Sequence, residues 1–167
     1  MYKKQYNQIR SLDSTRPLTS ASCKHYTDIC LDLPDIVSFN IYSGWYTNDS
    51  VDGEFEKELK WIKDAGGKDK PLIISEFGAA ALYGFRDKAG RRWSEEGQAN
   101  LLAESLDVYM NHKDVCGVFI WQFCDCRVTE EGEWYQSRAG MRNNKGIVDR
   151  FRRPKIAYET VKTKFKE

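Results

Sequence analysis

The sequence lacks the features that would tie a protein to a membrane or to nucleic acid. No apolar run in its 167 residues approaches the length of a membrane span. The polar N-terminus, residues 1–6, has no apolar core of the kind found in signal peptides. The 26 basic and 25 acidic side chains nearly cancel, which leaves no electrostatic case for nucleic acid or an anionic lipid surface. We therefore expect a cytoplasmic protein with neither a nucleic-acid nor a membrane partner.

A metal-ligating pattern is also missing. The five cysteines are odd in number, and Cys124 and Cys126 are separated by one residue, which is not the spacing of a zinc knuckle. The two histidines, His25 and His112, lie elsewhere in the sequence. The simplest expectation is reduced, buried thiols in a cytoplasmic protein, with no metal and no other cofactor.

Apolar residues are plentiful enough for a core. The chain is 41% hydrophobic and 13% aromatic, which is typical of a globular protein rather than a disordered one. Its length suffices for one domain. We predict a single domain over residues 1–167.

The most informative local pattern is PLIISEFG at residues 71–78. A continuous apolar run bounded by Pro and Gly favours a strand covered on both faces, as in a parallel sheet. Ionising Glu76 at the end of such a strand costs free energy unless a partner stabilises the charge. In α/β barrels, catalytic residues lie at the C-terminal ends of strands. On this octapeptide alone, Glu76 is either such a residue or a glutamate that reaches solvent at a strand end.

Hydrophobic periodicity predicts alternating helices and strands. A turn over residues 13–17 follows the first helix, and Gly66-Gly67 ends the second. The predicted helices are 1–12, 55–65, 94–112 and 155–165. The predicted strands are 18–23, 35–42, 72–75 and 115–123. Loops fill 78–92 and 124–153. This alternation predicts parallel strands with right-handed crossovers. Four strands are too few for an eight-stranded barrel, so half a barrel or a small open α/β sheet is expected.

Five motifs, in order, carry a resemblance to a known family. They are NIYSGWY at 40–46, IISEFG at 73–78, WSEEGQ at 93–98, WQF at 121–123 and NNKGI at 143–147. Together they resemble the C-terminal half of the catalytic barrel of β-glucuronidases, members of glycoside hydrolase family 2, from about Ser11 to about Lys164. The resemblance implies an α/β fold: a partial (half) TIM barrel of about four parallel strands, barrel strands 5 to 8, with flanking helices.

The resemblance implies a glycosidase and gives three residues a role near the bond that is cleaved. Glu76 would be the nucleophile of a retaining enzyme, in which two carboxyl groups lie about 5 Å apart. Tyr42 matches a tyrosine that contacts the nucleophile and would hold its carboxylate in the attacking rotamer. Trp121 matches a tryptophan whose indole face packs against a sugar ring.

Four further residues would recognise the sugar carboxylate. Asn143 and Lys145 match the family's Asn-x-Lys pair, which in β-glucuronidases recognises the C6 carboxylate, and an ammonium with an amide donor suits that group. Tyr46 matches a second tyrosine near the carboxylate. Arg138 lies near a family arginine, in a loop whose length differs here by about one residue. The implied substrate is a β-D-glucuronide. Taken alone, residues 143–146 are an ordinary turn sequence, because Asn and Gly tolerate left-handed backbone.

One part of the family pattern is absent. The family's general acid/base is a Glu preceded by Asn, and no Asn-Glu pair occurs in this chain. We expect an enzyme fragment that lacks this residue and is weakly active or inactive, because general acid catalysis contributes about a hundredfold to ten-thousandfold. Asp125 is a poor substitute. The expected partners are a carbohydrate substrate, the missing N-terminal half of the enzyme and, through open sheet edges, a second copy of the chain.

Other interpretations stay open. Family 2 also contains β-galactosidases, β-mannosidases and galacturonidases, and the Asn143/Lys145 pair argues for an acidic sugar among these substrates. A non-catalytic carbohydrate-binding or assembly module would use Trp45, Trp121 and Trp134 as a sugar platform. A purely structural domain is the remaining alternative.

Overall fold

The computed structural model describes residues 1–129, 131 and 138–166. The chain divides into two compact units. Unit 1 comprises Met1–Glu76 and Val108–Phe119, and unit 2 comprises Phe77–Asp107 and Ile120–Glu167. We describe each unit by itself, and a single domain over 1–167 stays a prediction.

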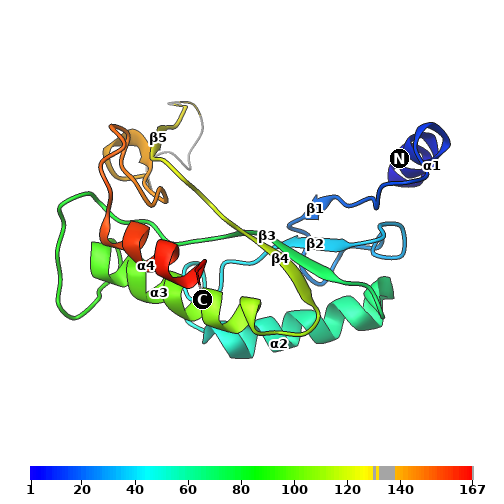
Figure 1. The fold of residues 1–167 in the computed structure, drawn as a ribbon, viewed down its shortest axis with the longest axis horizontal. Helices are drawn as coiled ribbons and strands as arrows, with labels where there is room; N and C mark the ends of the chain where they lie inside the picture. The colour runs from blue at the N-terminus through cyan, green and yellow to red at the C-terminus, as the bar shows by residue number, and fades with distance from the viewer. Residues whose placement is uncertain (130, 132–137, 167) are drawn as a thin grey trace. The chain divides into compact units, whose positions relative to one another are not determined.

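Unit 1 is built on a parallel sheet with the strand order β1-β2-β3-β4 (Figure 1). The strands are β1 (Ala21–Ser22), β2 (Val37–Asn40), β3 (Leu72–Phe77) and β4 (Val115–Ile120), and the last residues of β3 and β4 belong to unit 2. β2 pairs in parallel with both β1 and β3. Because the spatial order follows the chain, this is the sheet of four parallel strands that was predicted.

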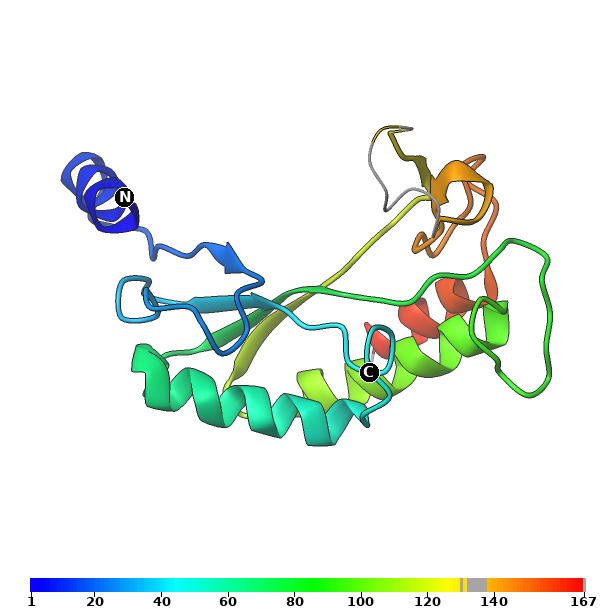
Figure 2. The same cartoon turned by 180° about the vertical axis from the view of Figure 1, so that it is seen from behind.

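Helices of unit 1 are α1 (Tyr2–Leu12) and α2 (Val51–Ile62), the latter followed by a π-helical turn, η1 (Lys63–Gly67). α2 runs along one face of the sheet (Figures 1 and 2) and buries Phe55, Leu59 and Ile62. It begins four residues earlier than predicted, because Ser50 Oγ accepts a hydrogen bond from Gly53 N at 3.2 Å and caps the helix. Gly66, at φ 112°, ends the helical run as expected.

The turn predicted after α1 is present. The Asp13 carboxylate accepts hydrogen bonds from the Thr15 amide (2.8 Å) and the Thr15 hydroxyl (2.7 Å). Together with Arg16, these bonds lower the pKa of Asp13 to about 2. An aspartate that bonds the backbone two residues later is the Asx turn that such sequences favour.

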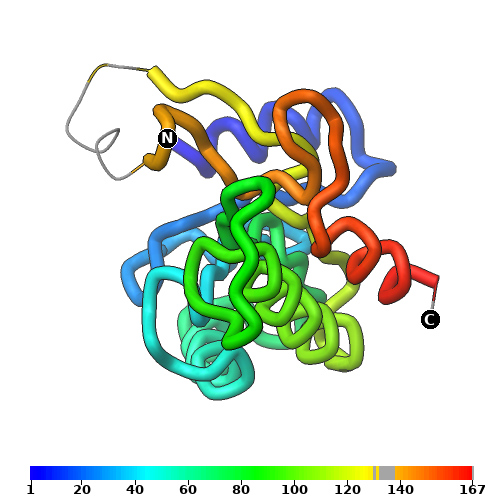
Figure 3. The backbone as a smooth tube through the Cα atoms, turned by 90° about the vertical axis from the view of Figure 1, so that its left-hand side faces the viewer, coloured from blue at the N-terminus to red at the C-terminus, as the bar shows by residue number. Residues whose placement is uncertain are grey.

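Unit 2 contains most of α3 (Glu95–Met110) and all of α4 (Ile156–Lys164), which are joined by a Lys164–Asp107 ion pair of 2.7 Å. Ser94 caps α3, because its Oγ accepts a hydrogen bond from Gly97 N at 3.0 Å. The loop over residues 78–92 folds back against this first turn (Figure 3), where Glu95 N donates to Phe85 O and Glu95 Oε1 accepts from Gly84 N. The Ser94-Glu95 start of the helix is therefore confirmed.

The segment predicted to be a loop from 124 to 153 contains regular structure. β5 (Cys126–Arg127) and β6 (Arg142–Asn143) pair antiparallel, and a 3₁₀ turn, η3 (Ala139–Met141), precedes β6. Two-residue strands give too little alternation to show in a sequence pattern.

The cysteines differ from expectation, because none of them is buried. Cys23, Cys116 and Cys126 are exposed, Cys30 and Cys124 are half-buried, and all are free thiols. The prediction of buried thiols was wrong: apolar sequence neighbours do not bury a strand residue such as Cys116, since successive side chains point to opposite faces.

Within the described residues, no group of His, Cys, Asp and Glu is arranged to hold a metal ion. Nor is any helix of the described chain long and apolar enough to cross a membrane.

Candidate active site

Glu76 is the next-to-last residue of β3, and its half-buried carboxylate has a defined partner. Tyr42 Oη donates a hydrogen bond to Glu76 Oε2 at 2.8 Å. The backbone supports the same pairing, because Ile41 N donates to Glu76 O at 2.8 Å, one residue beyond the end of β2. The contact predicted between Tyr42 and Glu76 is therefore present.

An irregularity in the sheet aligns these two residues. The register between β2 and β3 shifts between Phe39 and Asn40, so that Asn40 pairs with Glu76 rather than Ser75. The Ser75 hydroxyl instead donates to Asn40 Oδ1 at 2.8 Å. Bulges commonly redirect a side chain next to a functional site. Here the shift places the residues after β2 beside the carboxyl end of β3.

Two more aromatic residues extend this cluster in unit 1. The rings of Tyr42 and Tyr46 meet edge to face at a centroid distance of 5.3 Å, and Tyr46 is 62% exposed. Trp45 packs against Tyr46 but is only 6% exposed, so it has no face to offer a sugar. The proposed Trp45 part of a sugar platform is therefore wrong, and Trp134 lies outside the described residues.

Unit 2 contains the other candidate residues. Asn143 ends β6, and its Oδ1 accepts a hydrogen bond from Lys145 N at 3.2 Å. The Lys145 side chain is buried, whereas Trp121 is 40% exposed. Gln122 N donates to Lys145 O at 3.1 Å, which joins the segment after Trp121 to the Asn143–Lys145 loop. Arg138 is half-buried and directly precedes η3.

The structure thus brings the candidates together in two groups. Tyr42, Tyr46 and Glu76 form one group within unit 1. Within unit 2, the backbone of the Asn143–Lys145 loop is bonded to the segment that follows Trp121. The roles of all seven residues remain predictions.

Sequence reasoning missed a buried network under the Asn143–Lys145 loop. The Lys155 side chain is 0% exposed, and its Nζ donates to Ala81 O (2.7 Å), Asp125 Oδ1 (2.8 Å) and Asn144 O (3.0 Å). Asp125 Oδ1 also accepts a hydrogen bond from Gly146 N at 2.9 Å. Burial raises the pKa of Asp125 and lowers that of Lys155, while their ion pair opposes both shifts. The Asp125 carboxylate is therefore engaged in structural hydrogen bonds, in agreement with the expectation that it is a poor general acid.

Gln98, on α3, also contacts the segment that contains the Asn143–Lys145 loop. Its buried amide Nε2 donates to Ala79 O at 2.8 Å and to Gly146 O at 3.1 Å. No sequence pattern could have shown this network, because its members come from five separate segments. A charged or amide residue next to a helix start is normally exposed.

Gly146 is needed for a different reason from the one predicted. Its φ is not in the left-handed region, and Asn143 lies in a strand rather than in a simple turn. A Cβ at Gly146 would lie 2.3 Å from Asp125 N and 2.4 Å from Val148 O. Glycine is therefore required by close approach of the backbone, so the interpretation of residues 143–146 as an ordinary left-handed turn was wrong.

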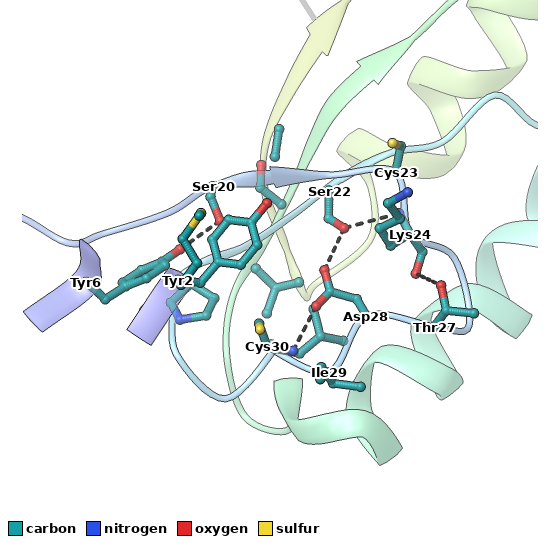
Figure 4. A pocket seen from close by; sticks show the side chains of 16 residues that line it. Tyr2, Tyr6, Ser20, Ser22, Cys23, Lys24, Thr27, Asp28, Ile29 and Cys30 are labelled. Atoms are coloured by element: carbon teal, nitrogen blue, oxygen red, sulfur yellow. Dashed lines mark hydrogen bonds between the residues drawn. The ribbon is translucent and has the colours of Figure 1, made fainter. Parts of the chain in front are cut away.

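A separate cavity of about 540 Å³ lies in unit 1 beside α1 and β1 (Figure 4). Tyr6 Oη and Ser20 Oγ are hydrogen-bonded at 2.8 Å on one side of it, and Ser22 Oγ donates to Asp28 Oδ2 at 2.6 Å on the other. Cys23 also lines it. None of the seven candidate residues borders this cavity, so it is not the candidate active site.

A parallel sheet with a carboxylate at the carboxyl end of an inner strand is the arrangement expected of part of an α/β barrel. The chain belongs to glycoside hydrolase family 2: residues 1–167 match the family model described as "Glycosyl hydrolases family 2, TIM barrel domain". The half-barrel expectation and the family resemblance are thereby confirmed.

Solved structures extend this likeness. A family 2 β-galacturonidase from Eisenbergiella tayi, bound to galacturonate, is 47% identical with a TM-score of 0.93, covering 99% of this chain and 29% of that chain. A β-D-glucuronidase from Dictyoglomus thermophilum is 26% identical with a TM-score of 0.85, covering 99% of this chain and 28% of that chain.

Curated relatives point the same way. The β-glucuronidase of Paenibacillus borealis is 29% identical over 173 residues, which cover 99% of this chain and 28% of that protein. Human β-glucuronidase is 32% identical over 157 residues, which cover 89% of this chain and 23% of that protein. The chain therefore spans less than a third of the length of these relatives.

Proposed function

We propose that this chain carries the nucleophile and the sugar-carboxylate site of a retaining β-D-uronidase. The observation that supports this most is the Tyr42–Glu76 hydrogen bond at the carboxyl end of β3, in a chain of family 2. The general acid/base would come from polypeptide outside these 167 residues, because no Asn-Glu pair occurs among them.

In the proposed reaction, Glu76 attacks the anomeric carbon of the sugar and the aglycone oxygen leaves with a proton from the general acid. Water then cleaves the glycosyl ester, and the configuration is retained. The hydrogen bond from Tyr42 to Oε2 fixes the carboxylate rotamer and leaves the other oxygen to attack. A preset rotamer lowers the entropy cost of reaching the transition state.

Asn143 and Lys145 would bind the sugar carboxylate, with Tyr46 and Arg138 near it. Lys145 is only 2% exposed, and a charge in a poorly solvated site attracts an anion more strongly than one in open water. Trp121 is exposed enough to pack its indole face against the pyranose ring.

A reagent that needs no general acid tests the nucleophile in this chain. A 2-deoxy-2-fluoro-uronyl fluoride loses fluoride without a proton, because fluoride is a good leaving group. The C1–F bond breaks and an ester forms between C1 and a Glu76 oxygen. We expect one sugar added by intact mass, located on Glu76, and no addition in Glu76→Gln. Labelling elsewhere, or unchanged labelling of Glu76→Gln, contradicts the assignment.

The choice between two uronic acids follows from one observation. The 47% identity to a β-galacturonidase exceeds the identities to the glucuronidases described above and favours a galacturonide. The galacto- and gluco-configured reagents therefore form a matched pair, and the galacto reagent should label faster. Lys145→Ala should slow labelling by either uronyl fluoride far more than by a neutral glycosyl fluoride, and equal losses would contradict carboxylate recognition.

Hydrolysis itself requires the missing acid. We expect little cleavage of an aryl β-uronide by the chain alone, and cleavage when the preceding part of the Eisenbergiella tayi barrel is supplied in trans. Self-association through the open edges of the sheet stays a prediction, which sedimentation velocity at several concentrations checks.

A further inference from the structure

We propose that unit 2 carries a second binding site, which takes a carboxylated sugar residue. The site is a cavity of about 460 Å³ lined by Tyr83, Arg142, Arg150 and Phe151, among other residues. Its volume falls within the range of about 300–1,000 Å³ that small-molecule sites occupy.

This cavity is distinct from the proposed carboxylate-recognition pair. Neither Asn143 nor Lys145 lines it, whereas the alternate residues Arg142 and Asn144 do. Asn144 Nδ2 donates to Ala139 O at 2.8 Å, which joins two residues that line the cavity. The inference goes beyond the proposed function and does not depend on Glu76.

The charges in the lining leave a positive surplus. Three arginines, Arg142, Arg150 and Arg153, line the cavity together with two aspartates, Asp125 and Asp149. Asp125 is paired with the buried lysine described above, and Asp149 Oδ2 accepts a hydrogen bond from Arg153 Nε at 2.7 Å. Within the described chain, Arg142 and Arg150 have no carboxylate partner. Two guanidinium groups are therefore available to an anion.

Exposed aromatic rings stand beside two of the three guanidinium groups, those of Arg150 and Arg153. The Arg153 guanidinium lies 4.1 Å from the centroid of Tyr83, and the Arg150 guanidinium lies 4.2 Å from that of Phe151. Tyr83 is 44% exposed and Phe151 is 61% exposed, so part of each ring remains open. Stacking against a ring holds a guanidinium in place and reduces the entropy that it loses on binding.

The combination selects a class of ligand. A guanidinium fork matches a carboxylate with two parallel hydrogen bonds. An aromatic ring packs well against the C–H face of a pyranose. An anion without a sugar ring would use the arginines only, and a neutral sugar would use the rings only. A uronate residue of an acidic oligosaccharide uses both.

Titration of the full chain with digalacturonate tests the proposal, with binding heats and amide chemical shifts as readouts. The test variant is the double substitution Arg142→Ala/Arg150→Ala. Arg152→Ala is the matched control, because Arg152 is an exposed arginine of the same loop that does not line the cavity. Galactobiose and inorganic phosphate are the comparison ligands, and thermal unfolding shows that the variants fold.

We expect the double variant to bind digalacturonate about tenfold more weakly or worse, and Arg152→Ala to change affinity by less than about twofold. Amide shifts should cluster at residues 149–153. Unchanged affinity in the double variant overturns the proposal, as does equally tight binding of phosphate or galactobiose. Lys145→Ala separates the two sites: loss of binding in that variant alone supports the proposed function and contradicts this cavity.

Discussion

One carboxylate in unit 1 and one ammonium in unit 2 are held in opposite ways. In unit 1 the half-buried Glu76 carboxylate takes a hydrogen bond from Tyr42 and can accept more. In unit 2 the Lys155 ammonium is inaccessible and spends its three N–H donors on three protein oxygens. Glu76 is therefore open to chemistry, whereas Lys155 is committed to structure. Hydrogen-bond saturation distinguishes the two roles better than burial does.

The largest effect on stability should come from Lys155. Lys155→Met leaves Asp125 buried without its cation, and breaking a buried pair in this way costs about 3–5 kcal/mol. Urea unfolding measures the loss. The control is Lys162→Ala, an exposed lysine of α4, which should cost less than about 0.5 kcal/mol.

A second substitution sharpens that result. Asp125→Leu added to Lys155→Met removes the unpaired charge, so part of the lost stability should return. If the single Lys155→Met variant is as stable as the native chain, the contrast drawn between Glu76 and Lys155 is wrong.

A smaller loss of stability is expected for Gly146→Ala. The new Cβ would meet Asp125 N and Val148 O at less than 2.5 Å, and overpacking of this kind costs about 1–3 kcal/mol. Gly84→Ala is a useful comparison. A Cβ there would have open space, so the only cost is backbone strain at a φ of 82°. Equal melting temperatures for Gly146→Ala and the native chain would show that the loop relaxes freely.

In unit 1, Tyr42→Phe should change reactivity more than stability. One hydrogen bond to a carboxylate that is only half-buried should contribute less than about 3 kcal/mol to stability. The rate of labelling by the fluorosugar should fall about tenfold, because the carboxylate loses its fixed rotamer. Tyr2→Phe, at an exposed tyrosine of α1 that is not among the candidate site residues, is the control. A loss of stability as large as that of Lys155→Met would contradict the comparison.

The smallest effect concerns pH. Hydrogen bonding to Glu58 raises the pKa of His25, although burial opposes the shift. A raised folded-state pKa contributes stability that is fully present below the unfolded value of about 6.5 and is lost as pH rises through the folded value. The contribution should stay below about 1 kcal/mol, because the imidazole is more than a third exposed.

Unfolding at pH 6, 7, 8 and 9 measures this contribution. The native chain should lose stability over that range relative to His25→Gln, which cannot titrate. Parallel pH profiles of stability for the two proteins would show that the His25–Glu58 pair does not contribute to the pH dependence.

Features with a local cause were predictable from the sequence. The Asx turn at Asp13, the Ser94 cap and the apolar run of β3 each depend on neighbouring residues, and each is present. The Tyr42–Glu76 contact was reached through the family resemblance rather than through periodicity.

Features made by distant segments were not predictable. The Lys155 network joins residues up to 74 positions apart, and nothing near Lys155 in sequence distinguishes it from a surface lysine. The β5–β6 pair, the exposed thiols and the true reason for Gly146 likewise depend on tertiary contacts. Sequence patterns report which way a segment prefers to fold, not which other segment will press against it.

The loop over residues 78–92 has one more consequence. Glu95 Oε1 accepts from Gly84 N and Oε2 accepts from Ile156 N, while Glu96 accepts from the Asp87 amide. These hydrogen bonds fix the conformation of the loop before any ligand binds. A ligand that contacts the loop would therefore cost little conformational entropy of the loop on binding, so specificity there should depend on shape. Lengthening the loop should reduce specificity before it reduces affinity.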